Sequence, residues 1–286
     1  LIGNPTNPAS ASPNVYQLGM APEQDGVQLA RRAYAAGHRR ALIIFAASDW
    51  GRRVSTATSN DWARLGGKIV AQTAVPVTGD HFTHAIRRLF HLDHSAARAA
   101  ALKKVLTHRL PFKAIPRRRQ DVDVIFLFCS RPQAQVINPQ IDFLYGHDLP
   151  VFSTSHLYHG TQDRLTDLDL DGIILGDMPW ILGSNGPRAF RAGGRNNPNT
   201  YRGTPLDRLF ALGMDAYALS SRITALRTIP EARYAGFSGQ LSSDGSGVIR
   251  RKLMWAQFQN AELIAMPQPN ASQNEGDSYL SRGDDS

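Results

Sequence analysis

The chain has 286 residues, of which 42% are hydrophobic, and a formal net charge of +8. The apolar fraction is far above that of an intrinsically disordered protein, and the length is enough to bury one large core or two modest ones. The longest uninterrupted apolar run, residues 41–47, is much too short for a transmembrane helix. The composition therefore predicts a globular protein and excludes an ordinary membrane-spanning helix.

From residue 24 to about residue 177, apolar runs typical of buried parallel strands alternate with helical patterns. The predicted strands are residues 41–46, 68–75, 122–128, 150–154 and 173–175, and the predicted helices are residues 24–36, 52–65, 80–106 and 131–145. Crossovers between parallel strands are right-handed almost without exception. This order of elements predicts an α/β fold with a mainly parallel sheet flanked by helices.

The pattern changes after Trp180. Residues 183–204 are rich in Gly, Asn, Pro and Arg, which predicts a long loop or an interdomain passage. A helix is expected from Pro205 to about residue 223, and alternating apolar residues over 236–266 predict small antiparallel strands. The last segment, residues 267–286, is polar and is expected to be a disordered tail.

Small, polar and aromatic side chains follow the predicted strands where each one ends. In open α/β sheets ligands bind outside the carboxyl ends of the strands, so a ligand site is expected there, with ordinary strand-end loops as the alternative. Hydroxyl groups would donate to a ligand, carboxylates would accept from an ammonium group, and aromatic rings would cover an apolar part. The candidate residues are Asp49, Trp50, Ser153, Thr154, Ser155, Tyr158, Asp177 and Trp180.

Two clusters have the residue types of metal sites. The histidines His81, His84, His91 and His94 fall in one predicted helix, but His84 and His91 would lie about 10 Å apart along it, too far to share an ion. The acidic loop at residues 162–171 lacks the internal glycine and closing glutamate of an EF-hand, so a solvated loop is favoured over a calcium site. No metal is predicted.

A basic stretch at residues 108–119, HRLPFKAIPRRR, is the densest part of the positive charge. Such a loop suits nucleic acid, lipid phosphates or cell-wall carboxylates, and its alternative is a solvated face. The sequence has no zinc-finger spacing, basic heptad region or aromatic RNA-binding strand. Nucleic acid is therefore not expected as a partner.

Motifs for catalysis are missing from the sequence. It contains no G-x-S-x-G elbow, dinucleotide-binding G-x-G-x-x-G turn, P-loop or H-E-x-x-H helix. The single cysteine, Cys129, excludes an internal disulfide and a multi-cysteine zinc site, and its place after an apolar run favours a buried thiol. We expect no catalytic residue and no cofactor.

Several stretches, among them SDWGRRV, LPVFSTSHLYHG and LDGIILGDMPWIL, resemble the carboxy-terminal domain of the LpoA (LppC) lipoproteins, activators of penicillin-binding proteins. The resemblance covers residues 1–266, and its most specific parts are RRRQDVD, TSHLY and GDMPW. It implies a fold like that of type I periplasmic binding proteins, with two α/β lobes, a cleft between them and three crossings of the chain.

The resemblance also implies a division of the chain. Residues 1–20 would end the amino-terminal half of lobe one, residues 21–177 would form lobe two, and residues 178–266 would be the hinge passage and the carboxy-terminal half of lobe one. The opening units of lobe one are then absent, so that lobe is incomplete. The candidate residues would line the cleft, and Gly176, Asp177 and Pro179 would form a hinge.

The function implied is that of a non-catalytic regulator of peptidoglycan synthesis in the periplasm, which contacts a class A penicillin-binding protein, with peptidoglycan as a further expected contact. Because Leu1 is not Met, a longer natural chain is expected. The resemblance implies that this longer chain carries an upstream lipidated cysteine, which anchors it to the outer membrane. The alternative is a periplasmic protein that binds an amino acid or a muropeptide-like molecule. A hydrolase ranks third.

Overall fold

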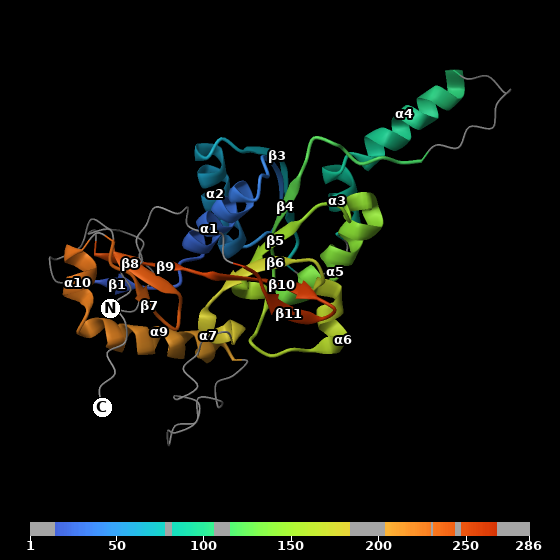
Figure 1. Ribbon diagram of the computed structural model, residues 1–286. Helices are drawn as coiled ribbons and strands as arrows, with labels where there is room; N and C mark the ends of the chain where they lie inside the picture. The colour runs from blue at the N-terminus through green and yellow to red at the C-terminus, as the bar shows by residue number, and fades with distance from the viewer. Residues whose placement is uncertain are drawn as a thin grey trace.

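The computed structural model describes residues 15–77, 82–105, 115–183, 204–229, 231–243 and 247–267. Two sheets organise them (Figure 1): a large sheet of seven strands in the order β11-β10-β6-β5-β4-β2-β3, and a small sheet of four in the order β1-β9-β8-β7. The large sheet contains β2 (Arg40–Ala46), β3 (Lys68–Val75), β4 (Val124–Phe128), β5 (Val151–Thr154), β6 (Ile174–Asp177), β10 (Met254–Gln259) and β11 (Glu262–Ala265). The small sheet contains β1 (Gln17–Leu18), β7 (Tyr234–Ala235), β8 (Gln240–Ser243) and β9 (Val248–Lys252).

Helices cover both faces of the large sheet, because side chains of its central strands alternate between two apolar cores. Ile43 and Phe126 face one core together with residues of α1 and α2, whereas Leu42 and Leu127 face the other together with residues of α3 and α5. The helices near this sheet are α1 (Pro22–Ala35), α2 (Asp49–Arg64), α3 (Thr83–Leu89), α4 (Leu92–Val105), α5 (Arg131–Ile141) and α6 (Arg164–Asp167), with short turns η2 (Asp142–Gly146), η3 (Ser155–Leu157) and η4 (Leu168–Leu170).

The predicted parallel sheet is confirmed by the pairing of β3, β2, β4, β5 and β6, and two antiparallel strands, β10 and β11, extend it. The resemblance assigned both of these to the lobe formed by residues 178–266, and the structure differs here. In β10, Trp255 packs in one core of the large sheet and Phe258 in the other. The burial of these two side chains on opposite faces explains why β10 joins the large sheet.

The small sheet is covered by α7 (Pro179–Leu182), α9 (Pro205–Ser220) and α10 (Ile223–Thr228). Ala211, Leu212 and Leu219 of α9 are buried in the core of this lobe, whereas Leu206 and Tyr217 are exposed. The chain passes between the two sheets three times, after β1, after β6 and after β9. The two-lobed architecture with three crossings thus agrees with the resemblance.

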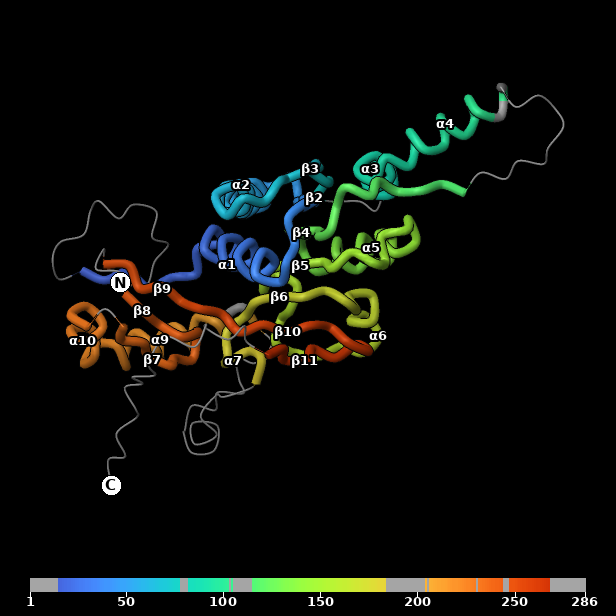
Figure 2. Tube along the Cα trace, turned by 45° about the horizontal axis from the view of Figure 1, so that its top comes forward, coloured from blue at the N-terminus to red at the C-terminus, as the bar shows by residue number. Residues whose placement is uncertain are grey.

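The predicted helix over residues 80–106 is two helices, α3 and α4, separated at Phe90 and His91. His91 has a left-handed backbone, with φ of 58°, which ends one helix and redirects the next. Figure 2 shows α4 projecting from the body of the molecule.

No helix in the described part of the chain has the length and apolarity needed to cross a membrane. The predicted loop at 183–204 and tail at 267–286 lie almost entirely outside the described residues.

Two glycines test the packing of these elements. A Cβ at Gly51, in the first turn of α2, would overlap with the carbonyl oxygen of Ala46 at the end of β2, whereas a Cβ at Gly213, inside α9, would meet no atom within 4 Å. We expect Gly51→Ala to lower the free energy of unfolding by about 1–3 kcal/mol. The control, Gly213→Ala, should raise it by up to about 1 kcal/mol because alanine favours helix. Urea unfolding measures both, and equal effects would contradict the packing described.

Candidate functional site

The first predicted site residues lie where β2 passes into α2. The Ser48 hydroxyl caps the helix by accepting from the Gly51 amide at 3.0 Å. Asp49 is 76% exposed and lies 3.5 Å from Arg52, so its carboxylate is directed to solvent. The Trp50 ring lies against the His156 ring, with centroids 4.3 Å apart, and its indole nitrogen is buried with no hydrogen-bond partner among the described residues. Trp50 is therefore close to the β5 loop, whereas Asp49 is not directed to it.

The hydroxyl groups at the end of β5 differ in their contacts. Ser153 is buried and donates to the carbonyl of Leu127 at 2.5 Å, so its hydroxyl is occupied by the sheet itself. Thr154 is also buried, but its hydroxyl has no partner in the part of the chain that the structure describes. Ser155 and Tyr158 contribute backbone carbonyls, which accept from the guanidinium of Arg208 at 3.1 and 2.7 Å.

Arg208 and Asp177 form the centre of this region. Asp177 is buried at the end of β6, where it accepts from the Met178 amide at 2.7 Å and from Nε of Arg208 at 3.1 Å, and a second guanidinium nitrogen contacts its other oxygen. Burial raises the pKa of Asp177 above its usual value, and the guanidinium opposes this rise. Since Arg208 lies on α9, this bidentate ion pair joins the small lobe to the large one.

The other predicted residues near β6 are part of the packing. Trp180 is buried, donates from its indole nitrogen to Asp207 at 2.5 Å, and packs against Phe210 and Phe237 with ring centroids 5.6 Å away in each case. Pro179 is the first residue of α7, and Gly176 pairs with Thr154 on one side and with Trp255 on the other. Trp180 therefore belongs to the core of the small lobe.

A second buried charge contact, which the sequence reasoning missed, lies beside the first. Asp25 on α1 is 13% exposed, and its Oδ1 is 3.8 Å from Arg251 of β9, with no hydrogen-bond partner within the described ranges. Burial raises the pKa of Asp25 to about 6, the charge of Arg251 opposes the rise, and that of Asp177 adds to it. Arg251 is buried and donates to the carbonyls of Gly19 and Ser238.

Together, these residues form what we call the charged junction: Asp25 and Asp177 from the large lobe and Arg208 and Arg251 from the small lobe. Gln28 strengthens it, because its amide donates to the carbonyl of Arg251 and accepts from the amide of Leu253, both at 2.9 Å. Asp25 is in the first turn of α1, where acidic residues are ordinary, so no local signal in the sequence indicates its role.

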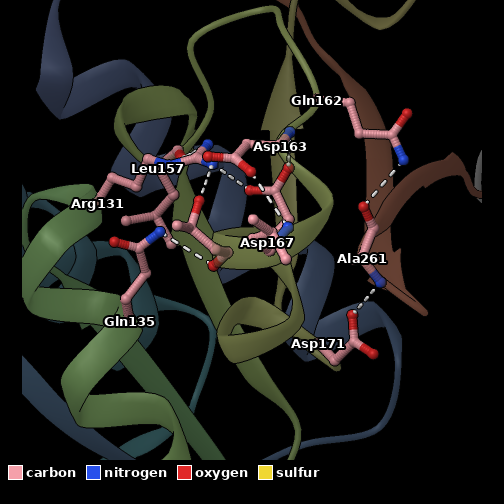
Figure 3. Close-up of polar contacts among 10 residues, drawn as sticks. Arg131, Gln135, Leu157, Gln162, Asp163, Asp167, Asp171 and Ala261 are labelled. Carbon is pink, nitrogen blue, oxygen red and sulfur yellow. Dashed lines mark hydrogen bonds and ion pairs between the residues drawn. The ribbon is translucent and has the colours of Figure 1, made fainter.

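The clusters considered for metals have other roles. In the acidic loop (Figure 3), Asp163 caps α6, Asp167 is buried against Arg131, and Asp171 accepts from the amides of Asn260 and Ala261 at 2.9 and 2.8 Å. Among the described residues, no group of three or more His, Cys, Asp or Glu side chains could hold a metal ion. His81 lies outside the described residues. Cys129 is buried, as predicted, and burial raises the pKa of its thiol.

Comparison with known sequences supports a single family. The profile of the family described as "LppC putative lipoprotein" matches residues 1–261. The penicillin-binding protein activators LpoA of Vibrio antiquarius and Edwardsiella piscicida are 28% and 27% identical over 249 and 270 residues. These alignments cover 85% and 88% of this chain but 40% and 37% of the relatives, so the chain spans about two-fifths of their length.

Solved structures agree on the fold. Full-length LpoA from Haemophilus influenzae has a TM-score of 0.67 at 19% identity, covering 93% of this chain and 43% of that one. The C-domain of the same protein, described as a regulator of PBP1A, has a TM-score of 0.66 at 18% identity and covers 93% and 74%. A "putative branched-chain amino acid ABC transporter" from Chromobacterium violaceum has a TM-score of 0.60 at 22% identity and covers 90% and 71%. The α/β two-lobed fold is thereby confirmed.

Removing one partner of the ion pair between Arg208 and Asp177 should lower the stability of the protein strongly. Arg208→Met leaves a buried carboxylate without its partner, and we expect the free energy of unfolding to fall by about 3–5 kcal/mol. Adding Asp177→Asn should recover part of this loss. The matched control is Arg164→Met, which breaks an exposed pair with Glu262 and should cost far less, because solvent screens that pair. Similar losses for the two single variants in urea unfolding would contradict a buried pair.

Asp25 should make stability depend on pH. Its folded-state pKa of about 6 is above the usual 3.8, so the folded protein holds this proton more tightly than the unfolded chain, and stability falls as pH rises through about 6. Asp25→Asn should remove this fall, and its stabilising effect should grow to about 3 kcal/mol by pH 8. Unfolding at pH 4 and pH 8 measures the difference, and a variant equally or less stable than the wild type at pH 8 would refute it.

Proposed function

Because the chain belongs to the LppC lipoprotein family, we propose that it is a regulator of peptidoglycan synthesis that activates a class A penicillin-binding protein by direct contact. The activator family is non-catalytic, and the described residues fit that character. In this proposal the protein works in the periplasm, attached to the outer membrane by a lipidated cysteine upstream, and peptidoglycan is a further contact.

One observation carries the choice of a contact protein over a receptor: three of the polar side chains at the sheet edge bind the protein itself. The hydroxyl of Ser153 donates to Leu127, the carboxylate of Asp177 binds Arg208, and the indole of Trp180 donates to Asp207. Groups used in this way are not available to a ligand unless these contacts break. They support a role in which the two lobes are held in one arrangement, with Gly176, Asp177 and Pro179 as the hinge.

A second candidate function is the binding of an amino acid or a muropeptide-like molecule, and one observation favours it. The indole nitrogen of Trp50 and the hydroxyl of Thr154 are buried and have no partner among the described residues. Buried polar groups usually have a hydrogen-bond partner, so these two groups would gain from a ligand or an ordered water. We rank this function second because it uses two of the eight candidate residues.

The proposed activity is tested by peptide crosslinking. The purified natural protein, added to its cognate class A penicillin-binding protein and lipid II, should increase the crosslinked fraction of the product in proportion to the complex formed. The measurement is chromatography of the digested product. Saturated binding with no change in crosslinking would refute the proposal.

A control separates the two candidate functions. A ligand at 100 times its dissociation constant stabilises a protein by about 2.7 kcal/mol, which raises the melting temperature. Free amino acids and muropeptide fragments should leave the melting temperature unchanged if the protein is a regulator only. The variant Thr154→Val shows whether any stabilisation observed involves the candidate site.

A further inference from the structure

Helix α4 is an element that the proposed function has not yet used. It projects from the body of the molecule in both views (Figures 1 and 2). Leu92 is buried and anchors its beginning, whereas Ala97, Arg98 and Leu102 farther along are exposed. Its 14 residues give a length of about 21 Å. Alanine, leucine, lysine and arginine are strong helix formers, so the composition of α4 favours a helix.

Basic side chains collect at the root of this helix. The chain returns beside it, and the Arg117 amide donates to the Ser95 hydroxyl at 3.1 Å. Arg119 Nη1 lies 3.3 Å from Nε2 of His91, and the rings of His91 and His94 are 5.1 Å apart. We call this face the basic arm and define it as His91, His94, Arg98, Arg117 and Arg119.

Few carboxylates balance the basic arm. Asp93 is occupied by Arg87 and Asp121 by Arg119, whereas neither Arg98 nor Arg117 has an acidic partner in the described part of the chain. Burial lowers the pKa of His91, and the charges of Arg119, His94 and Arg98 lower it further. The His91 imidazole is therefore neutral at neutral pH, and Arg119 is balanced by Asp121. The positive charge of this surface comes from the exposed guanidinium groups of Arg98 and Arg117, and such charge attracts negatively charged surfaces and speeds their association.

We propose that the basic arm is a docking surface for an acidic face of the partner synthase, an inference that rests on the proposed function. The mixture of side chains favours a protein over a membrane. Leu102 lies one turn beyond Arg98 on the same side of the helix, so exposed apolar and basic groups share one face. Helices that bind a membrane surface carry a broad face of bulky apolar residues, whereas most apolar residues of α4 are alanines.

The test reverses two exposed charges of the arm. Binding of the whole chain to the soluble periplasmic part of the cognate class A synthase is measured by biolayer interferometry at low and high salt. Arg98→Glu with Arg117→Glu should weaken binding at least about tenfold at low salt, and the difference should shrink as salt rises. The control, Arg52→Glu with Lys68→Glu, makes the same charge change on exposed residues elsewhere and should leave binding within about twofold.

The outcomes separate the arm from the function on which it rests. If the wild-type chain does not bind the synthase, the proposed function fails. If it binds and both double variants bind equally well, the docking surface is wrong. The proposal is also overturned if the Arg98→Glu with Arg117→Glu variant still binds the synthase and loses binding only to phosphatidylglycerol vesicles or to isolated peptidoglycan. Should the reversal lower the melting temperature, Arg98→Ala with Arg117→Ala is read in the same assay, and unchanged synthase binding overturns the proposal.

Discussion

The relation between the two lobes depends on the buried ion pair between Arg208 and Asp177. Taking both charges out of water is costly, and this cost is offset only where the remaining donors and acceptors are satisfied. Here the guanidinium binds the carboxylate at two positions and two backbone carbonyls, those of Ser155 and Tyr158, as well. These contacts exist in one arrangement of α9 against β6. The pair therefore fixes the position of the lobes more than it adds to stability.

The sequence is sufficient to predict the five parallel strands of the large sheet. Its central strands have long apolar runs because both faces of the sheet are buried. In β2, for example, the side chain of Leu42 packs in one core and that of its neighbour Ile43 packs in the other. The sheet that β10 joins was not predictable. An alternating strand near a turn signal fits either lobe, and only the burial of Trp255 and Phe258 in two different cores decides between them.

The place of Asp177 at a strand end was predicted, whereas its contacts were not. Asp177 was expected at the carboxyl edge of the sheet, and it lies there, but its partner is 31 residues away on a helix that belongs to the other lobe. The sequence separation hides this contact, as it hides the approach of Asp25 to Arg251. Ser153 shows a second reason why a site is hard to predict from sequence. Its hydroxyl binds a neighbouring strand, and in the sequence it cannot be told from a hydroxyl that binds a ligand.

The rigid junction and the projecting helix have complementary physical properties. A partner loses binding energy if it must first order the surface that it contacts. The root of α4 is fixed because Phe82, Ile86 and Phe90 are buried against the large sheet, and the helix itself is favoured by its own composition. With the lobes held by Arg208 and Asp177, a surface on the large lobe keeps a constant orientation relative to the small lobe. A protein that acts by contact needs both properties, whereas a receptor that closes around a ligand needs its lobes free to move.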